Sequence, residues 1–167
     1  MKPKQVATPA FRPGRHFEVL DEPVSDPYQL KEKLVEPSVC PDCGAVYRQG
    51  RWQWSTAPEN AQLTRCTACR RIKENLPAGY VSLGGAFLQS HREEILSLVR
   101  HLESREKSEH PLQRIIAIED QEDGLLITTT DIHLASGIGR ALQSAYQGEL
   151  DFHYNKDEYL LRMDWRR

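Results

Sequence analysis

The sequence predicts an α+β fold in which a small cysteine-bearing ribbon precedes a module with the element order α-β-β-α-β-β and an antiparallel sheet. Three observations support this prediction. The four cysteines of the chain stand in two Cys-x-x-Cys pairs. Strand-like segments flank a Gln-Gly turn between the pairs. After the second pair, two stretches with helical periodicity are each followed by two strand-like runs.

Residues 1–36 are predicted to form a flexible basic tail and a lead-in. Residues 1–16 contain three prolines, four basic side chains and no acid. They offer too little apolar area to order alone. Two interpretations stay open for this tail: an inert terminus, or a basic arm that becomes ordered on nucleic acid.

The four cysteines predict a closed metal site. Cys40 and Cys43 form one pair, and Cys66 and Cys69 form the other after a gap of 22 residues. Each turn brings two thiolates to one side, and two facing turns complete the tetrahedral sulfur cage that zinc prefers. Gly44 suits the positive φ that a residue after such a turn often needs. We therefore expect Zn²⁺ as the cofactor.

Three other uses of the cysteines compete with zinc binding. Two disulfides would suit a secreted domain, but the chain opens with Met-Lys-Pro-Lys and has no apolar run typical of a signal peptide. A thioredoxin-like motif needs a single Cys-x-x-Cys in a βαβ context. Iron in a rubredoxin-like cage stays open, because spacing alone does not separate iron from zinc. The second pair, however, lacks the Pro and Gly of a rubredoxin loop.

The segment between the pairs predicts a short hairpin. Side chains alternate at Val46 and Arg48 and again at Trp52 and Trp54, on either side of the turn Gln49-Gly50. Residues 37–79 thus read as a zinc ribbon. At this size a hydrophobic core is insufficient, so the metal must supply the folding energy.

Residues 80–167 are predicted to form a separate α+β domain. A short apolar segment with Val81 and Leu83 leads into it, and Thr130 and Asp131 offer an N-cap for its second helix. The periodic segments are a helix over 87–102, strands over 112–118 and 125–129, a helix over 134–145, and strands over 150–154 and 159–165. These segments predict a four-stranded antiparallel sheet with helices on one face.

Composition and charge bound the function. The longest apolar runs are far below the ~20 residues that a membrane span needs, so we expect a cytoplasmic protein without a membrane partner. Residues 1–91 hold 12 basic and 9 acidic side chains, whereas residues 92–167 hold 10 and 15. This asymmetry indicates that the front half meets a polyanion.

The ribbon carries the candidate nucleic-acid surface. Residues 40–73 contain six basic and two acidic side chains, although part of this charge offsets the thiolates of the metal cage. Arginine and lysine contact phosphates and aromatic rings stack on unpaired bases, which favours RNA over duplex DNA. The candidate RNA-binding residues are Arg48, Arg51, Trp52, Trp54, Arg70, Arg71 and Lys73.

Two structural roles compete with RNA binding. The tryptophans can pack the ribbon against the second domain, and Arg70 and Arg71 can stabilise metal-bound thiolates. No enzyme is predicted, because a cage of four cysteines leaves no position for an activated water. The histidines are more typical of structural positions, and Gly137-Ile-Gly139 lies within a helical stripe rather than after a strand.

Several motifs resemble a family of bacterial zinc-ribbon proteins largely without assigned function. These motifs are Cys40-Pro-Asp-Cys-Gly-Ala-Val-Tyr47, Gly50-Arg-Trp-Gln-Trp54, Cys66-Thr-Ala-Cys-Arg-Arg-Ile72, Pro77-Ala-Gly-Tyr80 and His91-Arg-Glu-Glu-Ile95. More remotely, the layout resembles the N-terminal half of the archaeal and eukaryotic large-ribosomal-subunit export adaptor family, named for nonsense-mediated decay. This second resemblance implies attachment to the large ribosomal subunit through the zinc module.

Together these observations predict a non-enzymatic, zinc-stabilised RNA-binding protein associated with the ribosome. Its expected partner is large-subunit ribosomal RNA, with a ribosomal protein as a further candidate. The alternative from another class is a protein-interaction adaptor whose ribbon is purely structural. A rubredoxin-like electron carrier is the third hypothesis.

Overall fold

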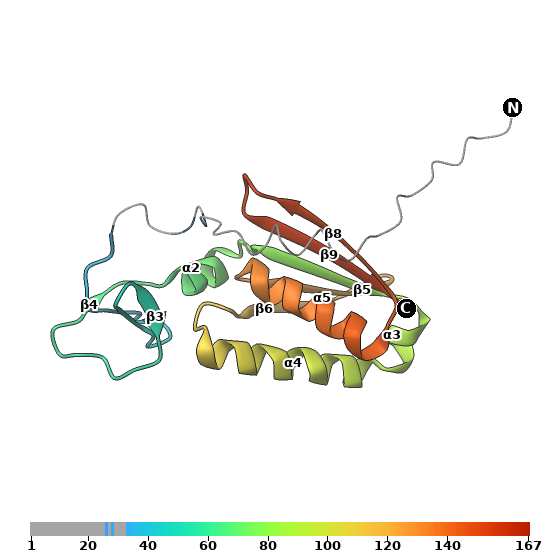
Figure 1. Ribbon diagram of the computed structural model, residues 1–167, viewed down its shortest axis with the longest axis horizontal. Helices are drawn as coiled ribbons and strands as arrows, with labels where there is room; N and C mark the ends of the chain where they lie inside the picture. Colours follow the sequence, from blue (N-terminus) through green and yellow to red (C-terminus); the bar gives the residue numbers. More distant parts are fainter. Residues whose placement is uncertain (1–25, 27, 29–32) are drawn as a thin grey trace, which may run out of the picture.

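The computed structural model describes Asp26, Tyr28 and residues 33–167 (Figure 1). The predicted basic tail and most of the lead-in therefore lie outside the described residues. The described chain contains a small sheet with the cysteines and a large sheet covered by helices. None of the described helices is long and apolar enough to cross a membrane.

The small sheet has the strand order β3-β2-β1-β4. Its strands are β1 (Ser38–Val39), β2 (Val46–Arg48), β3 (Arg51–Gln53) and β4 (Gln62–Leu63). The β2–β3 turn consists of Gln49 and Gly50, with φ of 55° and 75°, the backbone that a tight two-residue hairpin requires. The predicted hairpin between the cysteine pairs is thus confirmed.

Helix α2 (Thr67–Glu74) connects the small sheet to the large one. This helix was not predicted from the sequence. It ends at Asn75, whose φ of 50° gives the left-handed cap that often terminates helices.

The large sheet has five strands in the order β6-β7-β5-β9-β8. The elements in chain order are β5 (Gly79–Gly84), α3 (Ala86–Ser90), α4 (Arg92–Glu109), β6 (Ile115–Gln121), β7 (Gly124–Thr129), α5 (Ile132–Tyr146), β8 (Glu149–Asn155) and β9 (Leu160–Arg166). All neighbouring pairs are antiparallel except β5 with β9, which run parallel.

The prediction of a four-stranded antiparallel sheet is therefore wrong. The missing strand is β5, which lies at the centre of the sheet and aligns Val81 with Met163 of β9. A short apolar run does not distinguish strand from helix, and a parallel partner about 80 residues away leaves no local signal. The helix predicted over 87–102 is also divided, because α3 and α4 meet at His91.

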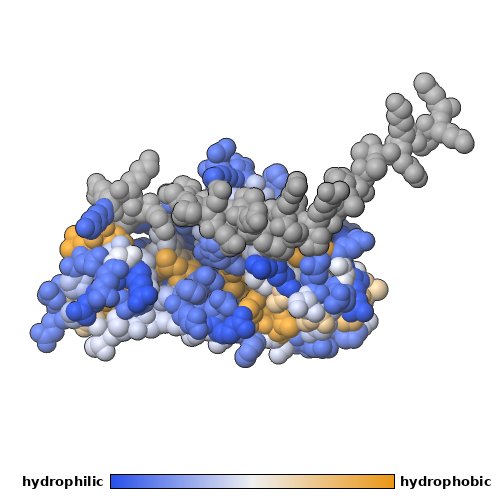
Figure 2. Space-filling model, in the orientation of Figure 1, coloured by the Kyte–Doolittle hydropathy of each residue, from blue (hydrophilic) through white to orange (hydrophobic). Residues whose placement is uncertain are grey.

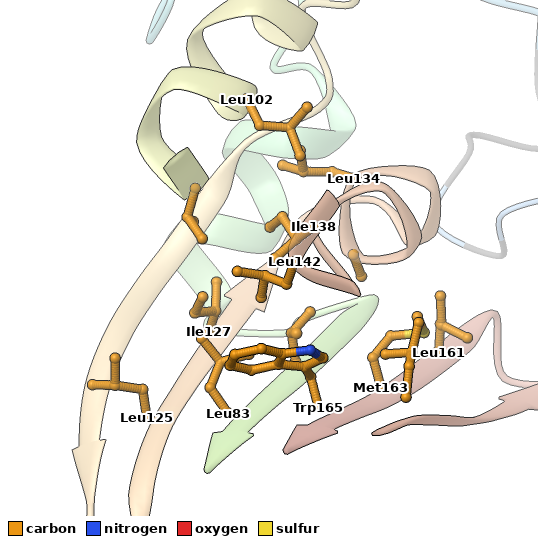
Figure 3. Close-up of a cluster of buried hydrophobic side chains, with 14 of the residues drawn as sticks. Leu83, Leu102, Leu125, Ile127, Leu134, Ile138, Leu142, Leu161, Met163 and Trp165 are labelled. Carbon is orange, nitrogen blue, oxygen red and sulfur yellow. The ribbon is translucent and has the colours of Figure 1, made fainter. Parts of the chain in front are cut away.

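The helices lie on one face of the large sheet, with α4 beside α5 (Figure 1). Figure 3 shows the core between the layers, where Leu134, Ile138 and Leu142 of α5 point toward the strands. Trp165 is fully buried there, and its indole N–H donates to the Gln147 carbonyl at 2.8 Å. Gly139 permits this close packing, because an added Cβ would lie 2.6 Å from Met163 Cε.

Candidate metal centre

The structure confirms that the four predicted ligands come together. The Sγ atoms of Cys40, Cys43, Cys66 and Cys69 all lie within 4.8 Å of one another. Cys43 is half-buried and the other three are buried. The small module consists of β1–β4 and α2 with their connections (residues 37–78). Two of its turns, far apart in sequence, thus form one cluster of sulfur donors.

The first cysteine pair lies in the turn between β1 and β2. The Gly44 amide donates to the Cys40 carbonyl at 2.9 Å, and the Cys40 amide donates to the Ala45 carbonyl at 2.8 Å. Gly44 has a φ of 78°, as the sequence predicted. This backbone conformation is accessible to glycine without steric cost. The turn therefore holds Cys40 and Cys43 on the same side.

The second pair lies at the start of α2. Cys66 is the N-cap residue, and its sulfur accepts a hydrogen bond from the Cys69 amide at 3.4 Å. The Cys66 amide in turn donates to the sulfur of Cys40 at 3.4 Å. Backbone amides and the positive end of the helix dipole both favour thiolates at this position. The start of α2 is therefore linked to the first cysteine turn by the hydrogen bond from the Cys66 amide to the Cys40 sulfur.

A buried arginine from the α+β module reaches the cluster. Arg114 donates through Nη1 to Cys69 Sγ at 3.2 Å and through Nη2 to Cys43 Sγ at 3.2 Å. The same Nη2 lies 3.5 Å from the sulfur of Cys66. Arg114 is only 6% exposed, and its Nε–H donates to the Pro111 carbonyl at 2.8 Å. Its guanidinium is therefore held in one orientation against three sulfurs.

Arg114 was not predicted from the sequence, where Arg70 and Arg71 were the candidates for this role. The available signal was a charged residue inside an apolar run, between Leu112 and Ile115. Such a residue needs a buried partner if the run is a strand in a core. The neighbouring sequence does not identify that partner, because the sulfurs lie 45 or more residues earlier in the chain.

The electrostatics of the cluster call for a cation. Burial would raise the pKa of Cys40, but backbone amides of Cys66, Cys43 and Asp42 outweigh burial and lower it to about 7. Burial raises the pKa of Cys66, and the neighbouring thiolates add to this effect. Burial also raises the pKa of Cys69, although the hydrogen bond and charge of Arg114 oppose it. Burial therefore opposes ionisation of Cys66 and Cys69 in particular. A bound divalent cation stabilises the ionised form of all four.

The donor set fits a structural metal ion. Four thiolates without oxygen or nitrogen ligands are typical of closed zinc sites, and the same set binds iron. An ion held by all four sulfurs would have its tetrahedral coordination filled by protein ligands. Cys40, Cys43, Cys66 and Cys69 would hold the ion, and Arg114 would compensate part of the cage's negative charge.

Two predicted RNA-binding residues, Arg48 and Arg51, lie at the tip of the ribbon. They are exposed and directly opposite each other across β2 and β3. Arg70 is half-buried and Lys73 is exposed, both on α2. Within the described residues, none of these four has an acidic partner at salt-bridge distance. Figure 2 shows mostly hydrophilic residues at this end of the molecule.

The two tryptophans do not share one free aromatic face. Trp52 packs against the cysteine cluster, and its ring centroid lies 5.4 Å from that of Tyr47. Trp54 is 39% exposed, but its indole N–H donates at 2.7 Å to the carbonyl of Lys107, near the end of α4. Trp54 therefore connects the ribbon to the second module, as the competing interpretation predicted.

Arg71 does not belong to the candidate RNA surface. It is buried, and its guanidinium donates to Asp26 Oδ1 at 2.8 Å and to the Leu76 carbonyl at 2.9 Å. The guanidinium carbon also lies 4.3 Å from the centroid of the Tyr28 ring. Within the described residues, Arg71 also has no hydrogen bond to a cysteine sulfur, so a structural role replaces both roles considered for it.

Another basic side chain of the ribbon is also paired. Arg65 forms an ion pair with Asp42, and its guanidinium lowers the pKa of that carboxyl. Because Asp42 lies within the first cysteine pair and Arg65 directly precedes the second, this ion pair joins the two cysteine-bearing turns.

Comparison with known proteins returned no match to a family model, a curated protein or a solved structure. The two family resemblances therefore stay predictions.

Proposed function

We propose that the protein is a zinc-stabilised RNA-binding protein whose ribbon contacts RNA phosphates. The observation that carries the proposal is the pairing of Arg48 with Arg51 across the hairpin. Like charges directly opposite each other destabilise a pair of strands. An anionic partner removes this repulsion and gains two phosphate contacts.

Glu36 is the acidic residue that is hydrogen-bonded to the turn of this hairpin, rather than ion-paired with its arginines, in the described structure. Its carboxylate accepts hydrogen bonds from the amides of Gln49 and Gly50 at 2.8 and 3.0 Å. In the described residues it forms no ion pair with Arg48 or Arg51. The turn is thus held rigidly while the two cations beside it stay available.

Some of the other basic side chains of the ribbon form ion pairs with acidic residues, and the rest do not. Arg65 is paired with Asp42 and Arg71 with Asp26. Arg114, from outside the ribbon, offsets part of the cage charge. Four cations then form no ion pair within the described chain: Arg48, Arg51, Arg70 and Lys73. A small rigid module with several unpaired cations is typical of proteins that bind a phosphate backbone.

We propose that bound zinc keeps the ribbon, and therefore Arg48 and Arg51, rigid. A ribbon of this size cannot fold on its own core, and structural zinc contributes of order 10–16 kcal/mol in small zinc peptides. The large-subunit ribosomal RNA is the polyanion that the export-adaptor resemblance implies. Iron in place of zinc would preserve the fold but would favour electron transfer, so the metal itself must be identified.

The test is binding of a stem-loop RNA over a range of salt concentrations. Four phosphate contacts predict that log affinity falls with log salt at a slope of about −3 to −3.5. Arg48→Glu with Arg51→Glu should reduce the affinity at least tenfold and make the slope shallower by about 2. The charge-matched control is Arg100→Glu with Arg105→Glu on α4. An RNA affinity that does not change with salt concentration would contradict the proposal. An equal loss of RNA affinity in both double variants would also contradict it.

A second candidate function is a protein-interaction adaptor. It is favoured by apolar side chains exposed on the small module, namely Leu63 (70% exposed), Ile72 (39%) and Leu76 (44%). If Ile72→Ser with Leu76→Ser abolishes a specific protein association while the arginine variants leave it intact, the adaptor is the better description. The two candidates thus use different side chains of the same module.

A further inference from the structure

A groove of about 700 Å³ lies where the ribbon meets the α+β module. The ribbon wall includes Tyr47, Arg51 and Trp52, and the opposite wall includes His110 and Gln113. These last two lie in the connection between α4 and β6. A volume of this size is typical of small-ligand sites, which span roughly 300–1,000 Å³.

Trp52 forms a rigid aromatic surface in this groove. The indole packs against the cysteine cluster and also lines the groove. Tyr47 lies directly across the strand pair, with the two rings tilted by 57°. An aromatic ring that is already fixed by packing stacks on a base without a further loss of conformational freedom.

The charges around the groove are unevenly placed. Lys33, Arg51 and Arg65 line it on the side of the ribbon and its lead-in, and Glu109 and Asp131 line it on the side of the α+β module. Arg51 has no acidic partner in the part of the chain that the structure describes. A ligand with an anionic group at one end and hydrogen-bonding donors at the other matches this arrangement.

We propose that this groove binds one unpaired nucleotide of an RNA strand. The base stacks on Trp52, its hydrogen-bonding edge faces His110 and Gln113, and its phosphate contacts Arg51. The inference rests on the proposed function, because it names what the same surface selects: single-stranded rather than duplex RNA. A base inside a duplex stays stacked on its neighbours and does not enter such a groove.

The test uses a single-stranded RNA of 12 nucleotides with one central 2-aminopurine, and the same strand in a full duplex. Stacking on Trp52 should quench the 2-aminopurine fluorescence of the single strand, and affinity is followed separately by anisotropy. The single strand is expected to bind about tenfold more tightly than the duplex, in the range that one stacked base provides.

The discriminating variant is His110→Glu with Gln113→Glu, on the wall opposite the ribbon. We expect it to abolish the quenching and to reduce single-strand affinity about tenfold, without changing duplex affinity. Ser97→Glu with Ser104→Glu, both exposed on α4 and outside the groove, is the charge-matched control. Trp52 itself is not substituted in this test, because it packs against the cysteines. Metal content and melting temperature confirm that each variant is folded.

The outcomes separate the two proposals. If RNA binds with the expected salt dependence but single strand and duplex bind equally and without quenching, the groove proposal is overturned and the proposed function stands. If neither RNA binds, both are overturned. If the wall variant abolishes a protein association and leaves RNA binding unchanged, the groove belongs to a protein partner and the nucleotide proposal is likewise overturned.

Discussion

Arg114 Nη1 lies 3.2 Å from Cys69 Sγ, although 45 residues separate the two in the chain. Arg114 is fixed on the α+β module, where its backbone amide donates to Thr130 Oγ1 at 3.0 Å. Cys69 lies in the small module at the start of α2. The contact therefore connects the cysteine cluster to the α+β module.

Replacing Arg114 should weaken both the metal centre and the contact between modules. Arg114→Met removes the buried cation that compensates the thiolates. Breaking a buried charged contact costs about 3–5 kcal/mol. We expect a loss of that order in the free energy of unfolding, together with faster metal release to a chelator. Denaturant unfolding and a chelator-competition assay measure the two effects.

Arg70→Met is the matched control for this experiment. Arg70 is a half-buried arginine on α2 that has no contact with a sulfur in the described structure. Its replacement should leave metal release unchanged. Equal metal release from the Arg114 variant and the wild type would show that the guanidinium has no role at the centre.

Metal removal should unfold the small module before the large one. The purified, reduced protein is expected to contain one zinc per chain and to be colourless. A chelator should abolish the amide protection of β1–β4, since small zinc modules depend on their metal. The large sheet should keep its protection, because its core is formed by side chains such as Trp165 and Ile138. Hydrogen exchange and elemental analysis provide the measurements.

Cys66→Ser is the matching variant for metal removal. It should reproduce the loss of protection without chelator, and the large sheet should again stay protected. A red protein would identify iron and favour the electron carrier. A metal-free protein with a fully protected small module would refute the metal centre altogether.

We expect the free energy of unfolding to depend on pH through the carboxyl of Asp131. Burial raises its pKa, opposed by His133, by the amides of Leu134 and His133, and by the Tyr159 hydroxyl. A carboxyl with a raised folded-state pKa contributes stability in its protonated form. That contribution is complete below about pH 3.9 and is lost as the pH rises through the folded-state pKa. The ionised side chain therefore lowers the free energy of unfolding at neutral pH.

Asp131→Asn tests this prediction because it keeps the helix cap. Asp131 Oδ1 accepts from the amides of His133 and Leu134 at 2.8 and 3.1 Å, and asparagine caps as well as aspartate. Relative to wild type, the variant should gain stability between pH 4 and pH 7, measured by urea unfolding. Asp131→Ala should instead lose about 1 kcal/mol through the cap. The exposed Asp157→Asn is the control, and a pH-independent difference at Asp131 would contradict the argument.

Association with the large ribosomal subunit is tested by sedimentation. In a lysate resolved on a density gradient, the protein should travel with the large subunit at low salt and return to the top at high salt, because phosphate contacts are screened. Arg48→Glu with Arg51→Glu should abolish the co-sedimentation, and Arg100→Glu with Arg105→Glu should not. Absence of the wild type from every ribosomal fraction would favour the adaptor.

The sequence by itself determined the features that depend on neighbouring residues. The Cys-x-x-Cys spacing predicted the sulfur cluster, and Gln49-Gly50 predicted the hairpin turn. The N-cap at Asp131 and the stripe from Leu134 to Leu142 predicted α5. Each of these signals acts within one turn or one helical period, so it can be read along the chain.

Only the tertiary structure decided which distant residues meet. It placed β5 at the centre of the sheet, parallel to β9, and it brought Arg114 rather than Arg70 or Arg71 to the thiolates. It also separated Trp52 from Trp54, which attach to different parts of the molecule. Parallel pairing, burial of a charge and contact between modules join segments far apart in sequence, and no local period or spacing records such partners.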